Sequence, residues 1–272
     1  MNATSHLPLT RPKLLWLLLA ALTLLATILR TLSLFLSMDG IGYFQENAIP
    51  VILFYITVAI AAAVCVALFF LINIMEDDKE QTLLAGPRFA GAAFAAATLG
   101  ATALFLILRA SALPTPTALN VLAAVLALCA ALYFALRLTR TNPETVVLFG
   151  YCAILATTLA LILTYFDRYT QMNAPHKLSF HICMLLAMLA LVLEQRALLD
   201  RAFPRLCMVL TAFCAVFCTA TALPNILAFA GGVYDDPLYL FFDIMTLGLA
   251  VYFDTKCISC ALTPAPRSED TQ

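Results

Sequence analysis

Charge is scarce in this chain of 272 residues: 11% of the side chains are charged and 63% are hydrophobic. A soluble domain typically carries about a quarter charged and about half apolar residues. The sequence also has no basic run of the kind that binds nucleic acid, and no P-loop, HExxH, GxSxG or DxD motif. A water-soluble fold, a nucleic-acid partner, ATP hydrolysis and the common membrane hydrolase chemistries therefore lack support.

Strict alternation of apolar and polar residues, which marks the strands of a membrane barrel, is missing as well. Long apolar runs are present instead, and about 20 apolar residues suffice to cross a bilayer as a helix. Eight such stretches occur: Leu14–Leu36, Val51–Met75, Phe89–Ser111, Thr117–Leu136, Thr145–Phe166, Leu178–Leu193, Leu206–Ala230 and Leu238–Phe253. We predict an all-α, polytopic transmembrane bundle of eight spans that is embedded in a lipid bilayer.

The basic residues predict which ends of the spans face the cytoplasm, because short cytoplasmic loops retain Lys and Arg. Eleven basic residues lie on the side of both termini and three on the other side, while Arg30 falls inside the first span. We expect a multi-pass protein of the cytoplasmic membrane with both termini inside. One integral domain would cover 1–272, with a cytoplasmic N-terminus over 1–13, the bundle over 14–256 and a disordered cytoplasmic tail over 257–272. The first apolar run is too long for a signal peptide, so we expect it to be retained.

Matching segments suggest an internal repeat of four spans plus four. The fourth span closes on Ala-Leu-Tyr-Phe at Phe134 with Arg137 after it, and the eighth closes on Ala-Val-Tyr-Phe at Phe253 with Lys256 after it. Four is an even number, so the two halves would share one orientation in the membrane. Chance matching of Leu- and Ala-rich helices is the alternative.

Two charges stand alone in the apolar runs, Arg30 in the first span and Asp243 in the eighth. A charge near mid-bilayer costs at least about 2.5–3.5 kcal/mol unless it is paired or hydrated. Both residues lie about 9 Å below the outer surface, so an ion pair between the first and last helices is one interpretation. The others are a gate or binding site for a charged solute, and an Arg30 that reaches up to the interface without meeting Asp243.

Three further polar residues fall near the same level: His181, Asn225 and Asp167. Histidine titrates near neutrality and could respond to protons beside a carboxylate, although a packed histidine is the simpler interpretation. Asn225 follows Pro224, and proline in a helix frees a backbone carbonyl. The predicted intramembrane polar cluster is therefore Arg30, Asp243, His181, Asn225 and Asp167. We expect Glu194, at the end of the sixth span, to reach out to the interface.

Nine cysteines are present, and none lies in a predicted outer loop. Cys257 and Cys260 form a CxxC just past the eighth span, but a structural zinc site needs four ligands. We predict no cofactor and no metal; acylation or a chance pair is the simpler interpretation of this motif. In the third span, Gly91, Ala95, Ala96 and Gly100 predict a helix that packs closely against its neighbours.

The segment from Asp167 to Arg205 contains Met172-Asn173-Ala174-Pro175-His176-Lys177, followed by Glu194-Gln195-Arg196 and Pro204-Arg205. This pattern, about forty residues long, resembles an uncharacterised family of polytopic bacterial membrane proteins. The resemblance implies a bacterial cytoplasmic membrane and no particular activity.

Three functions remain open at this point. A non-catalytic sensor, scaffold or partner subunit is favoured by short loops, and its partner would dock on the basic turn that carries Arg196, Arg201 and Arg205. A carrier or channel for a small solute would use an outward-facing cavity at the predicted polar cluster. An intramembrane enzyme acting on lipid is less favoured, because the carboxylates match no known motif.

Overall fold

The computed structural model consists of helices and short connections. It describes residues 11–39, 43–45, 47–71, 87–113, 115–139, 142–167, 170, 174–199 and 203–262. The helices are α1 (Arg11–Leu36), α2 (Ile49–Leu71), α3 (Pro87–Arg109), α4 (Thr117–Leu136), α5 (Pro143–Phe166), α6 (Pro175–Leu198), α7 (Pro204–Ala230) and α8 (Pro237–Leu262). All eight are long and apolar enough to cross a membrane, as predicted.

The predicted bounds agree best at α4, which begins and ends where the sequence indicated. They fail most at α8, which runs to Leu262, nine residues beyond the predicted end at Phe253. The predicted disordered tail is therefore wrong for 257–262, and the Cys257–Cys260 motif lies within α8 instead of after it. The acidic segment 76–80 lies outside the described residues.

Proline marks the start of most helices. Pro143, Pro175 and Pro204 occupy the first turn of α5, α6 and α7. A first-turn residue has no intrahelical partner for its N–H, so a proline there loses no hydrogen bond. At α5 the side chain of Asn142 also caps the helix by accepting from Glu144 N at 3.2 Å.

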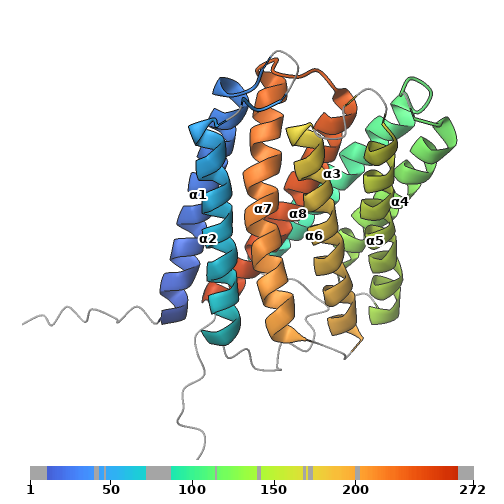
Figure 1. The fold of residues 1–272 in the computed structure, drawn as a ribbon. Coiled ribbons are helices and arrows are strands. Elements are labelled where there is room, and N and C mark those ends of the chain that lie inside the picture. Colours follow the sequence, from blue (N-terminus) through green and yellow to red (C-terminus); the bar gives the residue numbers. More distant parts are fainter. Residues whose placement is uncertain are drawn as a thin grey trace, which may run out of the picture.

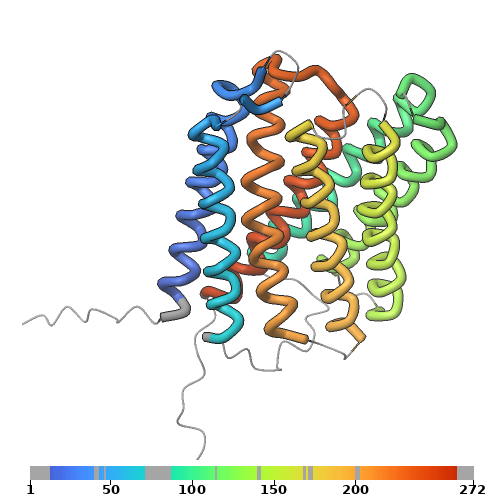
Figure 2. Tube along the Cα trace, viewed as in Figure 1, coloured from blue at the N-terminus to red at the C-terminus, as the bar shows by residue number. Residues whose placement is uncertain are grey.

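Six helices close into a ring in the order α3, α4, α5, α6, α7, α8, with α8 packing back on α3 (Figure 1). Helices α1 and α2 lie outside this ring, and both pack against α7. Figure 2 shows the same arrangement, with the blue and cyan helices side by side to the left of the orange one. We call the end of the bundle where α1 begins and α8 ends the termini face, and the other end the opposite face.

α3 and α8 pack closely against each other, as predicted for the third span at Gly91, whereas Gly100 has no atom within 4 Å of a Cβ added there. A Cβ added at Gly91 would overlap Thr255 on α8, and one at Gly248 on α8 would overlap Thr98 on α3. Thr102 Oγ1 also donates to Phe241 O at 3.0 Å. Small residues let these two backbones approach until polar side chains reach across.

The packing does not follow the pattern that a 4+4 repeat would give. In such a repeat the contact of α3 with α8 has its equivalent in α7 with α4. Among the described residues α7 packs extensively on α1, α2, α6 and α8 but not on α4. The duplication stays a prediction about the sequence.

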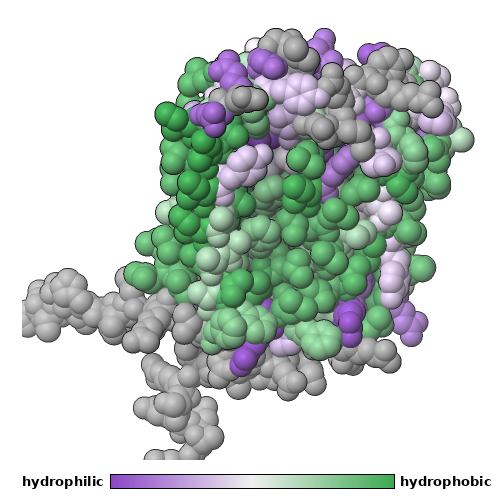
Figure 3. Space-filling model, viewed as in Figure 1, coloured by the Kyte–Doolittle hydropathy of each residue, from purple (hydrophilic) through white to green (hydrophobic). Residues whose placement is uncertain are grey.

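On the face that Figure 3 shows, a broad apolar zone lies between two more polar ends. Large hydrophobic side chains are exposed on every helix, among them Leu17, Phe70 and Leu108, which are 67%, 75% and 72% exposed. Soluble monomers rarely expose apolar patches beyond a few hundred Å². This is a polytopic integral membrane protein.

Candidate functional site

Arg30 on α1 is 1% exposed and lies between helices instead of reaching the surface. One nitrogen of its guanidinium, Nη2, donates to Pro175 O at 3.0 Å and to Ser179 Oγ at 3.1 Å, both on α6. The guanidinium carbon lies 5.1 Å from the Phe44 ring centre and 5.4 Å from that of Phe54. Backbone dipole, hydroxyl and aromatic faces thus surround the cation.

Asp243 on α8 is equally buried, at 1% exposed, and its neighbour across the helix interface is Asn225 on α7. Asn225 Nδ2 donates to Asp243 Oδ1 at 3.2 Å. The backbone carbonyl of Asn225 accepts a hydrogen bond of 2.5 Å from the Tyr234 hydroxyl. Asn225 therefore binds Asp243 through its side chain and the α7–α8 connection through its backbone.

The structure does not pair Arg30 with Asp243, which corrects the ion-pair interpretation. The two side chains influence each other electrostatically, but neither is among the described ion pairs. The physical reason is the helix order: α1 packs mainly against α2 and α7 and touches α8 only slightly. The ring closes through α8 and α3, not through the first and last helices.

Arg30, His176, Asn225 and Asp243 each have one buried polar atom without a hydrogen-bond partner among the described residues: Arg30 Nε, His176 Nδ1, Asn225 Oδ1 and Asp243 Oδ2. A buried polar atom left unmatched typically costs about 1–3 kcal/mol. We call Arg30, His176, Ser179, Asn225 and Asp243 the Asp243 cluster. It gathers residues of α1, α6, α7 and α8 near the opposite face.

Aromatic rings cover the cluster toward the opposite face. The Tyr234 ring stacks on His176 with centroids 4.8 Å apart, and the Tyr239 ring meets His176 edge-on at 5.1 Å. Burial raises the pKa of the Tyr234 hydroxyl, and the charge of Asp243 adds to the effect. Next to this cover, burial raises the pKa of the Asp236 carboxyl, which accepts from Leu238 N at the start of α8.

Asp167 lies between the Asp243 cluster and the opposite face and does not contact the cluster directly. Its carboxylate accepts from the Tyr239 hydroxyl at 3.4 Å. Lys177 is fully buried and donates to the carbonyl of Asp167 at 3.0 Å and that of Thr170 at 3.1 Å. Asp167 thus fixes the α5–α6 connection against α8.

His181 points away from the cluster. Its Nε2 lies 3.0 Å from Thr164 Oγ1 on α5, and its ring packs near Tyr165 and Phe180. Of the five predicted residues, the structure therefore brings together Arg30, Asn225 and Asp243, places Asp167 beside their cover, and separates His181.

A second buried polar group centres on Glu194 of α6, nearer the termini face. Glu194 is 3% exposed, so the prediction that it reaches the interface is wrong. Its carboxylate lies 3.6 Å from Arg137 Nη2 on α4 and 3.2 Å from Lys256 Nζ on α8. The Tyr252 hydroxyl donates to it as well. The equivalent basic ends of the proposed repeat thus converge on one carboxylate and tie α4, α6 and α8 together.

The cysteines form no metal site in the part of the chain that is described. No group of three or more His, Cys, Asp or Glu side chains there could hold a metal ion. Cys257 is buried in α8, and Arg88 Nη2 lies 3.9 Å from Cys260 Sγ.

The basic turn proposed for a protein partner is described only in part. Arg196 is exposed, and its guanidinium lies 4.6 Å from the ring centre of exposed Phe203. Arg205 is exposed too, whereas Arg201 lies outside the described residues. Partner docking stays a prediction.

No family model, curated protein or solved structure matches this chain. The resemblance seen over Asp167 to Arg205 therefore stays a prediction.

Proposed function

We propose that this membrane protein is a carrier for a small zwitterionic solute, which it binds at the Asp243 cluster. The observation that carries the proposal is a buried cation and a buried carboxylate that form no ion pair with described residues and keep unmatched hydrogen-bonding atoms. A membrane offers no water to satisfy such atoms, so a bound solute that matches them lowers the free energy of the cluster.

The unmatched atoms select the chemical class of the solute. At one end Arg30 Nε is a donor on a cation, and at the other Asp243 Oδ2 and Asn225 Oδ1 are acceptors. A small molecule with a carboxylate toward Arg30 and an ammonium toward Asp243 complements both ends. Such a solute would also bridge Arg30 and Asp243, which do not pair with each other.

The cover of the cluster supports carriage rather than a static scaffold. Phe44 and Tyr234 come from the α1–α2 and α7–α8 connections, and they close the cluster toward the opposite face. Loops with few buried contacts open at lower free energy than the helix core. Displacement of these two rings would open a route to Arg30 and Asp243, as an outward-facing cavity requires. The Glu194 group, in which one carboxylate meets two cations, closes the ring toward the termini face.

We further propose that the termini face is cytoplasmic and that the membrane is the bacterial cytoplasmic membrane. The excess of Lys and Arg on that side supports the orientation.

The binding claim is tested by thermal unfolding of the purified protein in detergent with glycine, alanine, serine or betaine. A ligand at 100 times its Kd stabilises the folded state by about 2.7 kcal/mol, which raises Tm by several degrees. Acetate and ethylamine carry only one half of the zwitterion each and should give much smaller shifts. Asp243→Asn and Arg30→Gln should lose the shift, and His181→Phe should keep it. Equal shifts with acetate, or a full shift in Asp243→Asn, would contradict the proposal.

A further inference from the structure

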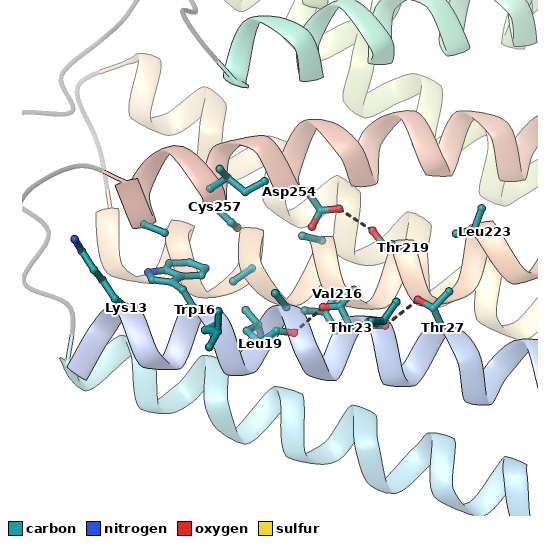
Figure 4. A pocket seen from close by; sticks show the side chains of 17 residues that line it. Lys13, Trp16, Leu19, Thr23, Thr27, Val216, Thr219, Leu223, Asp254 and Cys257 are labelled. Carbon is teal, nitrogen blue, oxygen red and sulfur yellow. Dashed lines mark hydrogen bonds between the residues drawn. The ribbon is translucent and has the colours of Figure 1, made fainter. Parts of the chain in front are cut away.

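A groove of about 710 Å³ runs along the outside of the bundle between α1, α7 and α8. Lys13 and Trp16 lie at its end near the termini face, and Thr27 and Leu223 lie at the other (Figure 4). Its walls are mostly apolar, and one acidic side chain, Asp254 of α8, lines it.

Asp254 lies near the middle of the membrane. Its Oδ2 accepts from Thr219 Oγ1 at 2.9 Å, and Thr219 is about midway along α7. Thr23, which lines the same groove, is about midway along α1. The sequence did not single out Asp254, because its neighbour Lys256 made this stretch look like the membrane boundary.

Asp254 has no cationic partner among the described residues. Its surroundings are Thr219, Cys214 and Cys218 on α7 and Cys257 on α8, all uncharged as thiols or hydroxyls. The cation that lines the groove, Lys13, is ten residues before Thr23 and therefore about 15 Å along α1. An unpaired carboxylate at this depth is costly, so the protonated acid is the lower-energy form.

We propose that Asp254 is an exchangeable proton site, which loses and regains its proton toward the termini face through the groove. The hydroxyls of Thr219 and Thr23 line the interior end of this route, at about the level of Asp254, and Lys13 lies at its mouth. A carboxyl sealed in the core could not exchange, whereas this one is in contact with an open groove.

The site is placed to couple proton binding to the solute site, and this coupling rests on the proposed carrier function. Asp243 and Asp254 are eleven residues apart on α8, which is three turns, so both lie on the same side of the helix. Both bind α7, through Asn225 and Thr219 respectively. A shift of α8 against α7 would change both contacts at once.

Dicyclohexylcarbodiimide tests the proton site without any solute. The O–H of a protonated carboxyl adds across one C=N bond, with the proton going to nitrogen and the oxygen to carbon, and the acyl group then migrates to nitrogen as a stable acylurea. In the wild-type protein in detergent, mass spectrometry of peptides should find the adduct on Asp254 and not on buried Asp243. The rate should fall as the pH is raised, because only the protonated carboxyl adds to the carbodiimide.

Thr219→Val serves as the matched variant, because it removes the hydrogen bond and leaves the carboxyl. It should still be labelled, whereas Asp254→Asn should lose the adduct and elute as a folded monodisperse protein. An unlabelled Asp254, or labelling of Asp254 that does not change with pH, overturns the proposal. Labelling that persists when no zwitterion raises Tm would leave the proton site standing and reject the carrier.

Discussion

At the scale of single residues, the buried charges fall into two kinds. Glu194 meets two cations and a hydroxyl, whereas Asp243 meets one amide and forms no ion pair with a described residue. A buried charge with its partners in place holds a structure together, and one without them depends on something else to satisfy it. The first kind indicates a group that stabilises the helix packing, and the second indicates a binding site.

The stabilising role of the Glu194 group can be tested by removing its carboxylate. Glu194→Ala leaves Arg137 and Lys256 without their shared anion, and breaking a buried pair from one side typically costs about 3–5 kcal/mol. Because Lys256 is partly exposed, we expect a loss at the lower end of that range, measured as a fall in Tm in detergent.

Glu144→Ala is the control, since Glu144 is exposed at the start of α5. It should shift Tm little. If Glu194→Ala had the same Tm as Glu144→Ala, the Glu194 group would not stabilise the packing of α4, α6 and α8.

The isolated buried charges could be predicted from the sequence, whereas those with polar neighbours along the chain could not. Arg30 and Asp243 stand out because apolar residues surround each of them along the chain. Glu194 and Asp254 lie next to other polar residues, so their stretches looked like membrane boundaries. What distinguishes them is the neighbouring helix that each one faces, and that partner is set by packing and not by local sequence.

At the scale of helices, the presence of each helix was easier to predict than its length. Hydrophobicity reports where a helix enters lipid, and α4 ends near that point. α8 continues through Asp254 and Lys256 because these side chains turn to Thr219 and Glu194 instead of to water. The polar residues that appeared to end the span are part of the packed interior.

The α3–α8 contact provides a test at this scale. Gly248→Ala places a methyl group against Thr98, and overpacking of this kind typically costs about 1–3 kcal/mol. Tm should fall, and Thr98→Ala should recover most of the loss in the double variant.

Gly100→Ala is the matched control, because no atom lies within 4 Å of a Cβ there. Alanine is favoured over glycine inside a helix by about 1 kcal/mol, so Tm should hold or rise. A larger loss at Gly100 than at Gly248 would contradict the close packing of α3 on α8.

At the scale of the whole molecule, the eight helices separate a closed six-helix ring from the outlying pair α1 and α2. Arg30 belongs to the outlying pair and the rest of the Asp243 cluster to the ring. The two candidate sites thus lie along α1, where it meets the ring. We infer that relative movement of α1 and α7 opens or closes both.

The orientation is testable with cysteine variants in intact cells. Asn47→Cys lies on the opposite face and Phe203→Cys on the termini face, and both positions are exposed. A membrane-impermeant maleimide should label Asn47→Cys from outside above the wild-type background. Phe203→Cys should react only after permeabilisation, and the reverse pattern would invert the proposed topology.

The most direct test of the carrier is counterflow in proteoliposomes loaded with unlabelled alanine and placed in a trace of radiolabelled alanine. We predict transient accumulation of label by the wild-type protein and none by Asp243→Asn, with Asp167→Asn retaining part of the activity because Asp167 lies outside the cluster. Equal accumulation by wild type and Asp243→Asn, or no accumulation of alanine, glycine or serine by the wild type, would contradict the account.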